Sequence, residues 1–155
     1  MQLHLRGATI DDLELLTDMN RQLIEDEGSS NPMNREQLKR RMRDWLTSDW
    51  KVDLLMSGDA IVGYALYQFR FNVYRPEVRE AYIRQYFIGR AYRKTGYGLQ
   101  GVELLKEQRL KDAETIEIDV LESNRIGKSF WLKAGFAPYV TNMRMSNRSG
   151  WKDGE

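Results

Sequence analysis

Apolar residues recur at helical spacing in four stretches of this chain. Leu13, Leu16 and Leu23 mark one face of the first stretch, and Thr9 followed by Asp12 has the form of a capping box at its start. Gly135 follows the last stretch, where a glycine commonly ends a helix. The predicted helices cover residues 9–25, 34–46, 98–111 and 125–134.

Shorter segments rich in β-branched and aromatic residues lie between these stretches and predict strands. The sequence Ser57-Gly58-Asp59 predicts a turn between two of them. The predicted strands cover residues 3–6, 51–57, 61–71, 81–88, 116–120 and 139–145.

The order of these elements predicts a mixed α/β (α+β) fold. Three consecutive antiparallel strands are followed by a right-handed crossover through the helix at residues 98–111. The result is a central, mostly antiparallel sheet with about four flanking helices. Strands 81–88 and 116–120 would run parallel, and their carboxyl ends can splay apart to admit a ligand.

The composition is that of one small domain. The chain has 155 residues, 24 basic and 23 acidic side chains, a net charge of +1 and no cysteine. We expect a single domain over residues 1–147 and a polar tail over 148–155, with Trp151 docking on its own domain or, as the alternative, on a partner. This balance predicts no nucleic-acid, membrane or metal partner. No leader or membrane-spanning pattern is present, so we expect a soluble, cytoplasmic protein.

The turn between residues 88 and 99 carries the clearest chemical signal. Arg90, Arg93 and Lys94 lie beside Gly96 and Gly98, directly before a predicted helix. Backbone N–H groups at a helix start, together with positive side chains, favour an anion such as a phosphate. We expect a Cβ atom at either glycine to intrude on the space of a phosphate oxygen.

The spacing of these glycines is compatible with two classes of nucleotide-containing cofactor, and the first is the dinucleotides. Gly96, Gly98 and Gly101 spell G-x-G-x-x-G, with Asp119 about twenty residues further on, as in dinucleotide-binding proteins. That fold, however, places its first glycine almost directly after the strand and repeats βα units, which this chain lacks. The dinucleotide interpretation is therefore the weaker one.

Residues 93–98, RKTGYG, resemble the R/Q-x-x-G-x-G/A signature of the GNAT superfamily of acyl-CoA-dependent N-acetyltransferases. Residues 124–136, NRIGKSFWLKAGF, resemble a second segment of that superfamily, and the likeness extends over nearly the whole chain. The resemblance implies acetyl-CoA as the cofactor. The residues expected to bind it are Phe87, Ile88, Arg93, Lys94, Thr95, Gly96, Tyr97, Gly98 and Asn124.

These residues differ in how they would bind. The resemblance implies that main-chain groups of Phe87 and Ile88 pair with the pantetheine arm, and that the Asn124 amide also meets it. Asn124 is equally suited to cap the helix that follows it.

Three side chains are candidate catalytic groups. Many GNAT members protonate the leaving thiolate with a tyrosine, but the matching position here is Trp131, whose indole cannot release a proton near neutral pH. Tyr82 and Tyr86, expected on one face of their strand with Gln85 on the other, are candidate acids or packing residues. Glu122 is a candidate base through water.

The expected activity is transfer of an acetyl group from acetyl-CoA to a primary amine of a small molecule or a peptide. The alternative is an acyl-CoA-binding module without efficient catalysis, and a homodimer is possible. Polyamine-acetylating relatives have Glu-Asp where this chain has Arg84-Gln85, which favours an acceptor bearing a carboxylate. The acidic cluster Glu25-Asp26-Glu27, which the resemblance places near the acceptor side, argues against such an acceptor, although a cluster of this kind is usually solvated surface.

Overall fold

A computed structural model describes residues 2–148, so Trp151 and most of the predicted tail lie outside the described residues. The sheet has five strands in the order β1-β2-β3-β4-β5. All neighbours are antiparallel except β4 and β5, which run parallel as predicted. The strands are β1 (Leu3–Gly7), β2 (Lys51–Ser57), β3 (Ala60–Phe71), β4 (Arg79–Ile88) and β5 (Thr115–Ile118).

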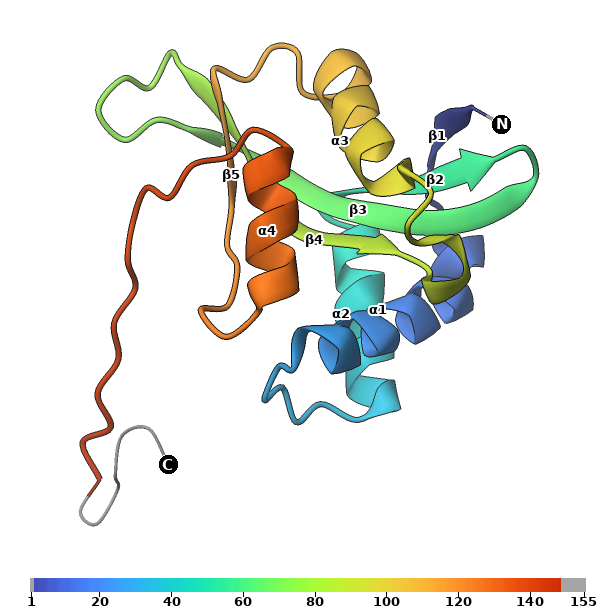
Figure 1. Ribbon diagram of the computed structural model, residues 1–155, viewed down its shortest axis with the longest axis horizontal. Helices are drawn as coiled ribbons and strands as arrows, with labels where there is room; N and C mark the ends of the chain where they lie inside the picture. The colour runs from blue at the N-terminus through green and yellow to red at the C-terminus, as the bar shows by residue number, and fades with distance from the viewer. Residues whose placement is uncertain (1, 149–155) are drawn as a thin grey trace.

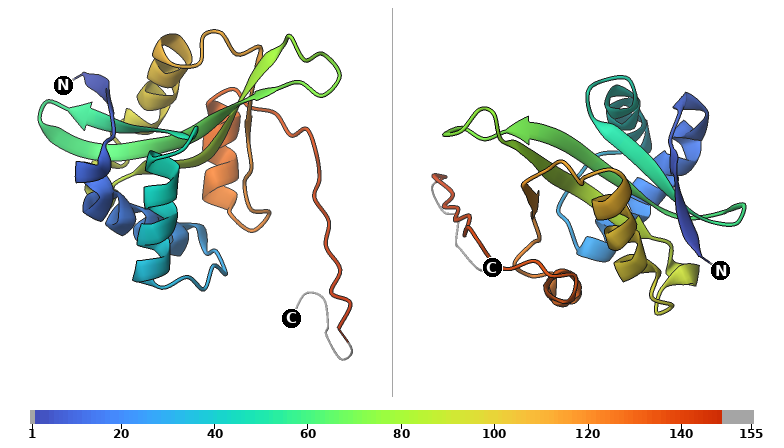
Figure 2. Two further views of the ribbon diagram at one scale, coloured as in Figure 1. Left: turned by 180° about the vertical axis from the view of Figure 1, so that it is seen from behind. Right: turned by 90° about the horizontal axis from the view of Figure 1, so that it is seen from above.

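Four α-helices and two short 3-10 turns surround this sheet, which lies between helices α1 and α2 on one face and α3 and α4 on the other (Figures 1 and 2). Capping boxes at Thr9 and Asn34 and a left-handed Gly135 after α4 are all present. The elements are η1 (Ile10–Asp12), α1 (Leu13–Glu27), α2 (Arg35–Leu46), η2 (Arg90–Tyr92), α3 (Tyr97–Gln108) and α4 (Arg125–Lys133). No helix within residues 2–148 has the length and apolarity needed to cross a membrane.

Each face of the sheet has its own buried core. Leu16, Met42 and Tyr64 belong to the cluster under α1 and α2. Ile83 and Leu105 belong to the cluster under α3. The apolar stripes read from the sequence therefore face the sheet, and burial of such surface is the main stabilising contribution to the fold.

A bulge in β4 changes which side chains share a face. Leu66 pairs with Gln85 and Tyr67 with Ile83, so the intervening Arg84 has no partner on β3. One extra residue reverses the alternation of side chains beyond it.

The bulge makes one prediction about the strand wrong, namely that Tyr82 and Tyr86 share a face. The Tyr82 ring meets Trp50 on the α2 side, whereas the Tyr86 hydroxyl donates a hydrogen bond to the Gly98 carbonyl of α3. Gln85 reaches Tyr64 and so lies on the same face as Tyr82.

The parallel pairing between β4 and β5 is short. It joins Glu80 to Thr115 at one end and Ile83 to Ile118 at the other. Beyond Ile83, residues 84–88 of β4 have no strand on that side among residues 2–148. The predicted splaying of the two strands is therefore present.

The predicted last strand at residues 139–145 is wrong. The chain there forms no strand and extends away from the body of the molecule (Figure 1). The side chains of Tyr139 and Met143 are 88% and 87% exposed. A strand forms by pairing with a neighbour, and none of the described strands borders this segment.

A buried carboxylate joins β2, β3 and α3. Asp53 is 3% exposed, accepts a hydrogen bond of 2.5 Å from the Tyr67 hydroxyl, and lies 3.2 Å from the Nε atom of Arg109. Burial and this hydrogen bond raise the pKa of Tyr67. A buried charge is tolerated when its partners are in place and becomes costly when one is removed.

We predict that Asp53→Ala lowers the free energy of unfolding by about 3 to 5 kcal/mol, because it leaves Arg109 without its carboxylate. Urea denaturation of the variant beside Glu107→Ala, an exposed carboxylate on α3, measures this. The control should change stability by less than about 0.5 kcal/mol. Equal effects of the two substitutions would contradict the assigned role of Asp53.

Candidate functional site

A cleft opens between the end of α1 and the start of α4. Its volume is about 470 Å³, and it is lined by residues 25–28 at the end of α1 and by residues 123–126 at the start of α4. Asn124, which was predicted from sequence, and Glu27, which was not, therefore face the same space. Openings at the carboxyl ends of parallel strands are common ligand sites.

The turn between β4 and α3 has two residues in the left-handed conformation, Lys94 (φ 64°) and Gly96 (φ 85°). A Cβ atom on Gly96 would meet nothing within 4 Å, so this glycine serves the backbone conformation. The N–H groups of the first turn of α3 have no partner inside the helix. The turn is therefore suited to bind an anion, as the sequence indicated.

Gly98 and Gly101 serve packing. A Cβ atom on Gly98 would lie 2.8 Å from the Phe130 ring of α4, and one on Gly101 would lie 2.2 Å from the Tyr86 hydroxyl. We expected Gly98 to leave room for a phosphate oxygen. The structure instead places an aromatic ring in that space.

The backbone of the unpaired end of β4 alternates in direction. The Gly89 N–H donates to the Val62 carbonyl, so Phe87, two residues earlier, also turns its polar groups toward β3. Ile88 turns its own groups to the open side, where its carbonyl accepts from Nε of Arg93 at 2.8 Å. Of the two residues expected to pair with pantetheine, Ile88 alone presents main-chain groups to the opening.

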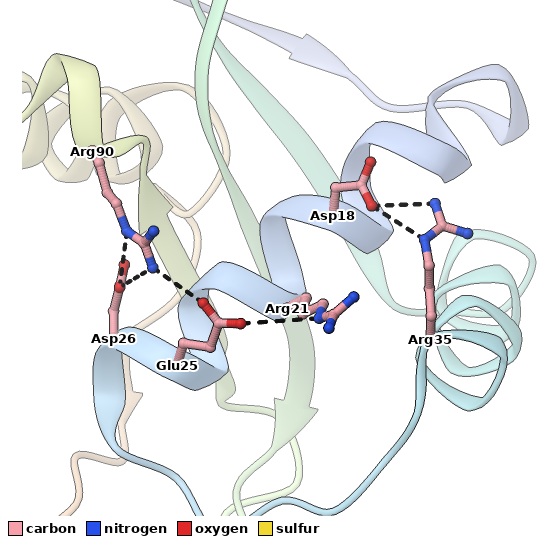
Figure 3. Close-up of polar contacts among 6 residues, drawn as sticks. All are labelled: Asp18, Arg21, Glu25, Asp26, Arg35 and Arg90. Carbon is pink, nitrogen blue, oxygen red and sulfur yellow. Dashed lines mark hydrogen bonds and ion pairs between the residues drawn. The ribbon is translucent and has the colours of Figure 1, made fainter.

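Ion pairs tie the turn to the end of α1 (Figure 3). Arg90 lies 2.7 Å from Asp26 and 3.3 Å from Glu25, and Arg93 also pairs with Asp26. Burial would raise the pKa of Asp26, but the hydrogen bonds from the two arginines bring it below its ordinary value. In the first half of α1, Asp18 accepts a hydrogen bond from Arg35 of α2.

The remaining predicted cofactor residues have varied surroundings. The Tyr97 hydroxyl hydrogen-bonds Ser57 at 3.1 Å, so its side chain points into the core. The Thr95 hydroxyl donates to the Tyr92 carbonyl, and Lys94 is exposed. Asn124 caps α4 by accepting from the Gly127 N–H at 3.0 Å.

Each of the three candidate catalytic residues has a different local environment. The Tyr82 hydroxyl donates to Asp119 at 2.6 Å, and burial together with this bond raises the pKa of Tyr82 to about 12. Burial also raises the pKa of Tyr86. The carboxylate of Glu122 pairs with Lys128.

Trp131, which stands at the family's tyrosine position, packs in an aromatic cluster on α4. Its ring centroid lies 5.6 Å from that of Tyr86, 4.9 Å from that of Phe130 and 5.2 Å from that of Phe136. Such contacts are typical of a packing role.

Sequence reasoning missed a buried polar group on the opposite face of β4. Asn20 is fully buried beside Tyr64, whose hydroxyl donates to Gln85 at 2.8 Å. The available signal was a polar side chain on the apolar stripe of α1, between Leu16 and Leu23. Burying an amide without hydrogen-bond partners is unfavourable, so a polar residue at this position indicates a specific role for Asn20.

Residues 16–136 match the family model of the acetyltransferase (GNAT) family, and the chain belongs to this family. A comparison with curated protein sequences finds no significant match. The predicted family and fold class are thereby confirmed, and the fold itself is shared with solved structures.

Three of these structures illustrate the likeness. A possible acetyltransferase from Clostridium difficile 630 has a TM-score of 0.76 at 16% identity, over 96% of this chain and 99% of the other. A predicted acetyltransferase with acetyl-CoA from Clostridium acetobutylicum has 0.71 at 17%, over 94% and 96%. An aminoglycoside acetyltransferase from an uncultured soil metagenomic sample, in complex with sisomicin, has 0.69 at 15%, over 94% and 97%.

We predict that Gly98→Ala destabilises the protein by about 1 to 3 kcal/mol, because the new methyl group overpacks against Phe130. In a Phe130→Leu background the same change should be neutral or stabilising, since alanine favours a helix over glycine by about 1 kcal/mol. Thermal unfolding of the four proteins of this double-mutant cycle measures the coupling. Additive effects would show that Phe130 is not the constraint on residue 98.

Proposed function

We propose that this protein transfers an acetyl group from acetyl-CoA to the primary amine of a small molecule or peptide. The observation that carries the proposal is the position of the opening. The unpaired end of β4 leads directly into the glycine turn and the first turn of α3. A ligand with an extended arm and a charged phosphate end matches these two features in that order.

The residues proposed to hold the cofactor follow from their placement. Backbone N–H groups of residues 94–98 suit the pyrophosphate, and the exposed Lys94 adds positive charge beside them. Ile88 offers main-chain groups to the arm, which requires Arg93 to leave the Ile88 carbonyl. When bound, acetyl-CoA supplies the thioester whose carbonyl carbon the amine attacks.

The proton balance of the reaction requires a base. As the N–C bond forms and the C–S bond breaks, the amine nitrogen loses a proton and the departing sulfur gains one. We propose Glu27 as the base, since it lines the cleft together with Asn124. Burial and the negative charge of Asp26 raise the pKa of Glu27 above its ordinary value of 4.5, toward the operating range of a general base.

The identity of the acid that protonates the departing thiolate stays a prediction. Tyr82 and Tyr86 retain their protons at neutral pH, and both remain candidate acids. Glu122, which pairs with Lys128, remains a candidate base acting through water.

We predict that acetyl-CoA raises the melting temperature of the protein and that NADH does not. A ligand that binds only the folded state at one hundred times its dissociation constant stabilises it by about 2.7 kcal/mol. Differential scanning fluorimetry measures both. Stabilisation by NADH alone would reject the proposal. Stabilisation by acetyl-CoA without thiol release for any amine would favour the binding-module alternative.

We predict that Glu27→Gln lowers kcat for an accepted amine by about 10² to 10⁴, the usual contribution of a general base. In the parent enzyme kcat should fall as the pH drops through the raised pKa of Glu27, because the protonated carboxyl no longer accepts a proton. The variant should lose this limb of the pH profile, while Glu36→Gln, an exposed carboxyl on α2, should keep it. Unchanged kcat with intact acetyl-CoA binding would exclude Glu27 as the base.

A further inference from the structure

Two guanidinium groups meet at one tryptophan ring on the α1/α2 side of the sheet. The Cζ atom of Arg41 lies 4.6 Å from the centroid of Trp45, and that of Arg84 lies 5.3 Å from it. Arg41 and Trp45 come from consecutive turns of α2, whereas Arg84 is the bulged residue of β4. We refer to Arg41 and Arg84 as the arginine pair.

The arginine pair has no carboxylate partner. None of the ion pairs within residues 2–148 includes Arg41 or Arg84, although six other arginines, Arg6, Arg35, Arg75, Arg90, Arg93 and Arg109, lie within 3.3 Å of a carboxylate oxygen. Two arginines without a carboxylate partner therefore face the same aromatic ring.

Two buried hydrogen-bond donors beside the arginine pair also lack an acceptor. Arg41 donates from Nη2 to the Asn20 side chain at 3.2 Å, but its buried Nε atom has no partner among the described residues. The Nδ2 atom of Asn20, which is fully buried, likewise lacks one. Buried donors without acceptors are costly, so an anion whose oxygens took up these hydrogen bonds would be bound favourably.

The two charges also disfavour one another. Burial, and then the positive charge of Arg84, lower the pKa of Arg41. An anion between the two groups would remove this repulsion and accept their hydrogen bonds.

The arginine pair lies at the start of the opening. Arg84 directly follows Ile83, the last residue of β4 that pairs with β5. Its neighbour Gln85 bonds Tyr64, the buried hydroxyl whose environment also includes the charges of Arg41 and Glu27. The proposed base and the arginine pair therefore flank one buried tyrosine.

We propose that the arginine pair binds a carboxylate of the acceptor, so that the acceptor is a primary amine that also carries a carboxylate group. This inference rests on the proposed acetyl transfer and adds the chemical class of its substrate. A planar carboxylate matches the fork of a guanidinium in a bidentate manner, and Trp45 provides an apolar wall beside it. Glu27 faces the amine end with the opposite charge.

The test compares amines that differ only in charge at the distal group. Protein amino acids, β-alanine and γ-aminobutyrate are assayed against their carboxamides at saturating acetyl-CoA, with thiol release as the readout. We expect at least one acid to exceed its amide by about tenfold or more in kcat/KM, since hydrogen bonds to charged groups are the strong ones. The amines of the amides are less basic, so a larger fraction of them is unprotonated and able to attack. This difference favours the amides and therefore works against the proposal.

Variants then locate the effect. Arg41→Gln and Arg84→Gln should each lower kcat/KM for the preferred acid by about tenfold to about a hundredfold and leave the amide within about twofold. Arg40→Gln, an exposed neighbour on α2, should leave both unchanged. The melting-temperature shift with acetyl-CoA should persist in all three variants, which shows that they fold and bind the cofactor.

The outcomes separate the two proposals. Absence of both acetyl-CoA stabilisation and thiol release would reject the acetyl transfer itself. Stabilisation by acetyl-CoA with no acid preferred over its amide, or with a preference that both variants retain, would reject the carboxylate site. A preference for O-phosphoethanolamine over ethanolamine that exceeds every acid-to-amide ratio would assign the arginine pair to a phosphate and overturn the carboxylate assignment.

Discussion

The early end of the parallel pairing between β4 and β5 is the constraint on which the rest of the site depends. Backbone N–H and C=O groups need partners, yet beyond Ile83 one side of β4 has no adjacent strand among the described residues. The protein meets part of this need with Arg93, whose Nε atom bonds the Ile88 carbonyl. The unpaired side of β4 is thus both an energetic liability and a template on which an extended ligand can pair.

The ion pairs between α1 and the glycine turn can be replaced by contacts to another anion. Asp26 pairs with both Arg90 and Arg93, so ion pairs join the end of α1 to the turn. Partly exposed ion pairs contribute little net stability, commonly 0 to about 1 kcal/mol. Phosphate oxygens can therefore compete for the same guanidinium groups. The cost of releasing Arg93 is small beside the gain from charge-assisted bonds to a phosphate.

Local signals made most of the fold predictable from sequence. The capping residues Thr9 and Asn34, and Gly135 after α4, act within one or two turns, so their outcome is visible in a short window. The faces of Tyr82 and Tyr86 were not predictable, because one bulged residue reverses the alternation and has no separate sequence signal.

The other predictions that the structure corrects depend on residues that are far apart in the sequence. The role of Gly98 depends on Phe130, which comes close only after α3 and α4 dock. Residues 139–145 have the composition of a strand, but composition does not provide the neighbour that a strand requires. Glu27 belonged to an acidic cluster that is ordinarily solvated, and only the three-dimensional structure shows it lining the cleft.

Charge in this protein is organised locally rather than globally. The net charge of +1 provides no long-range attraction for either sign of ligand. Around the opening, however, unneutralised groups are separated by sign: Glu27 at the end of α1, and Arg41 and Arg84 at Trp45. Because Glu27 and Arg41 are partly buried, salt screens them less than it screens surface charges. A ligand that carries both signs would neutralise both ends at once, whereas a simple amine would leave the two guanidinium groups repelling each other beside a buried, unsatisfied amide.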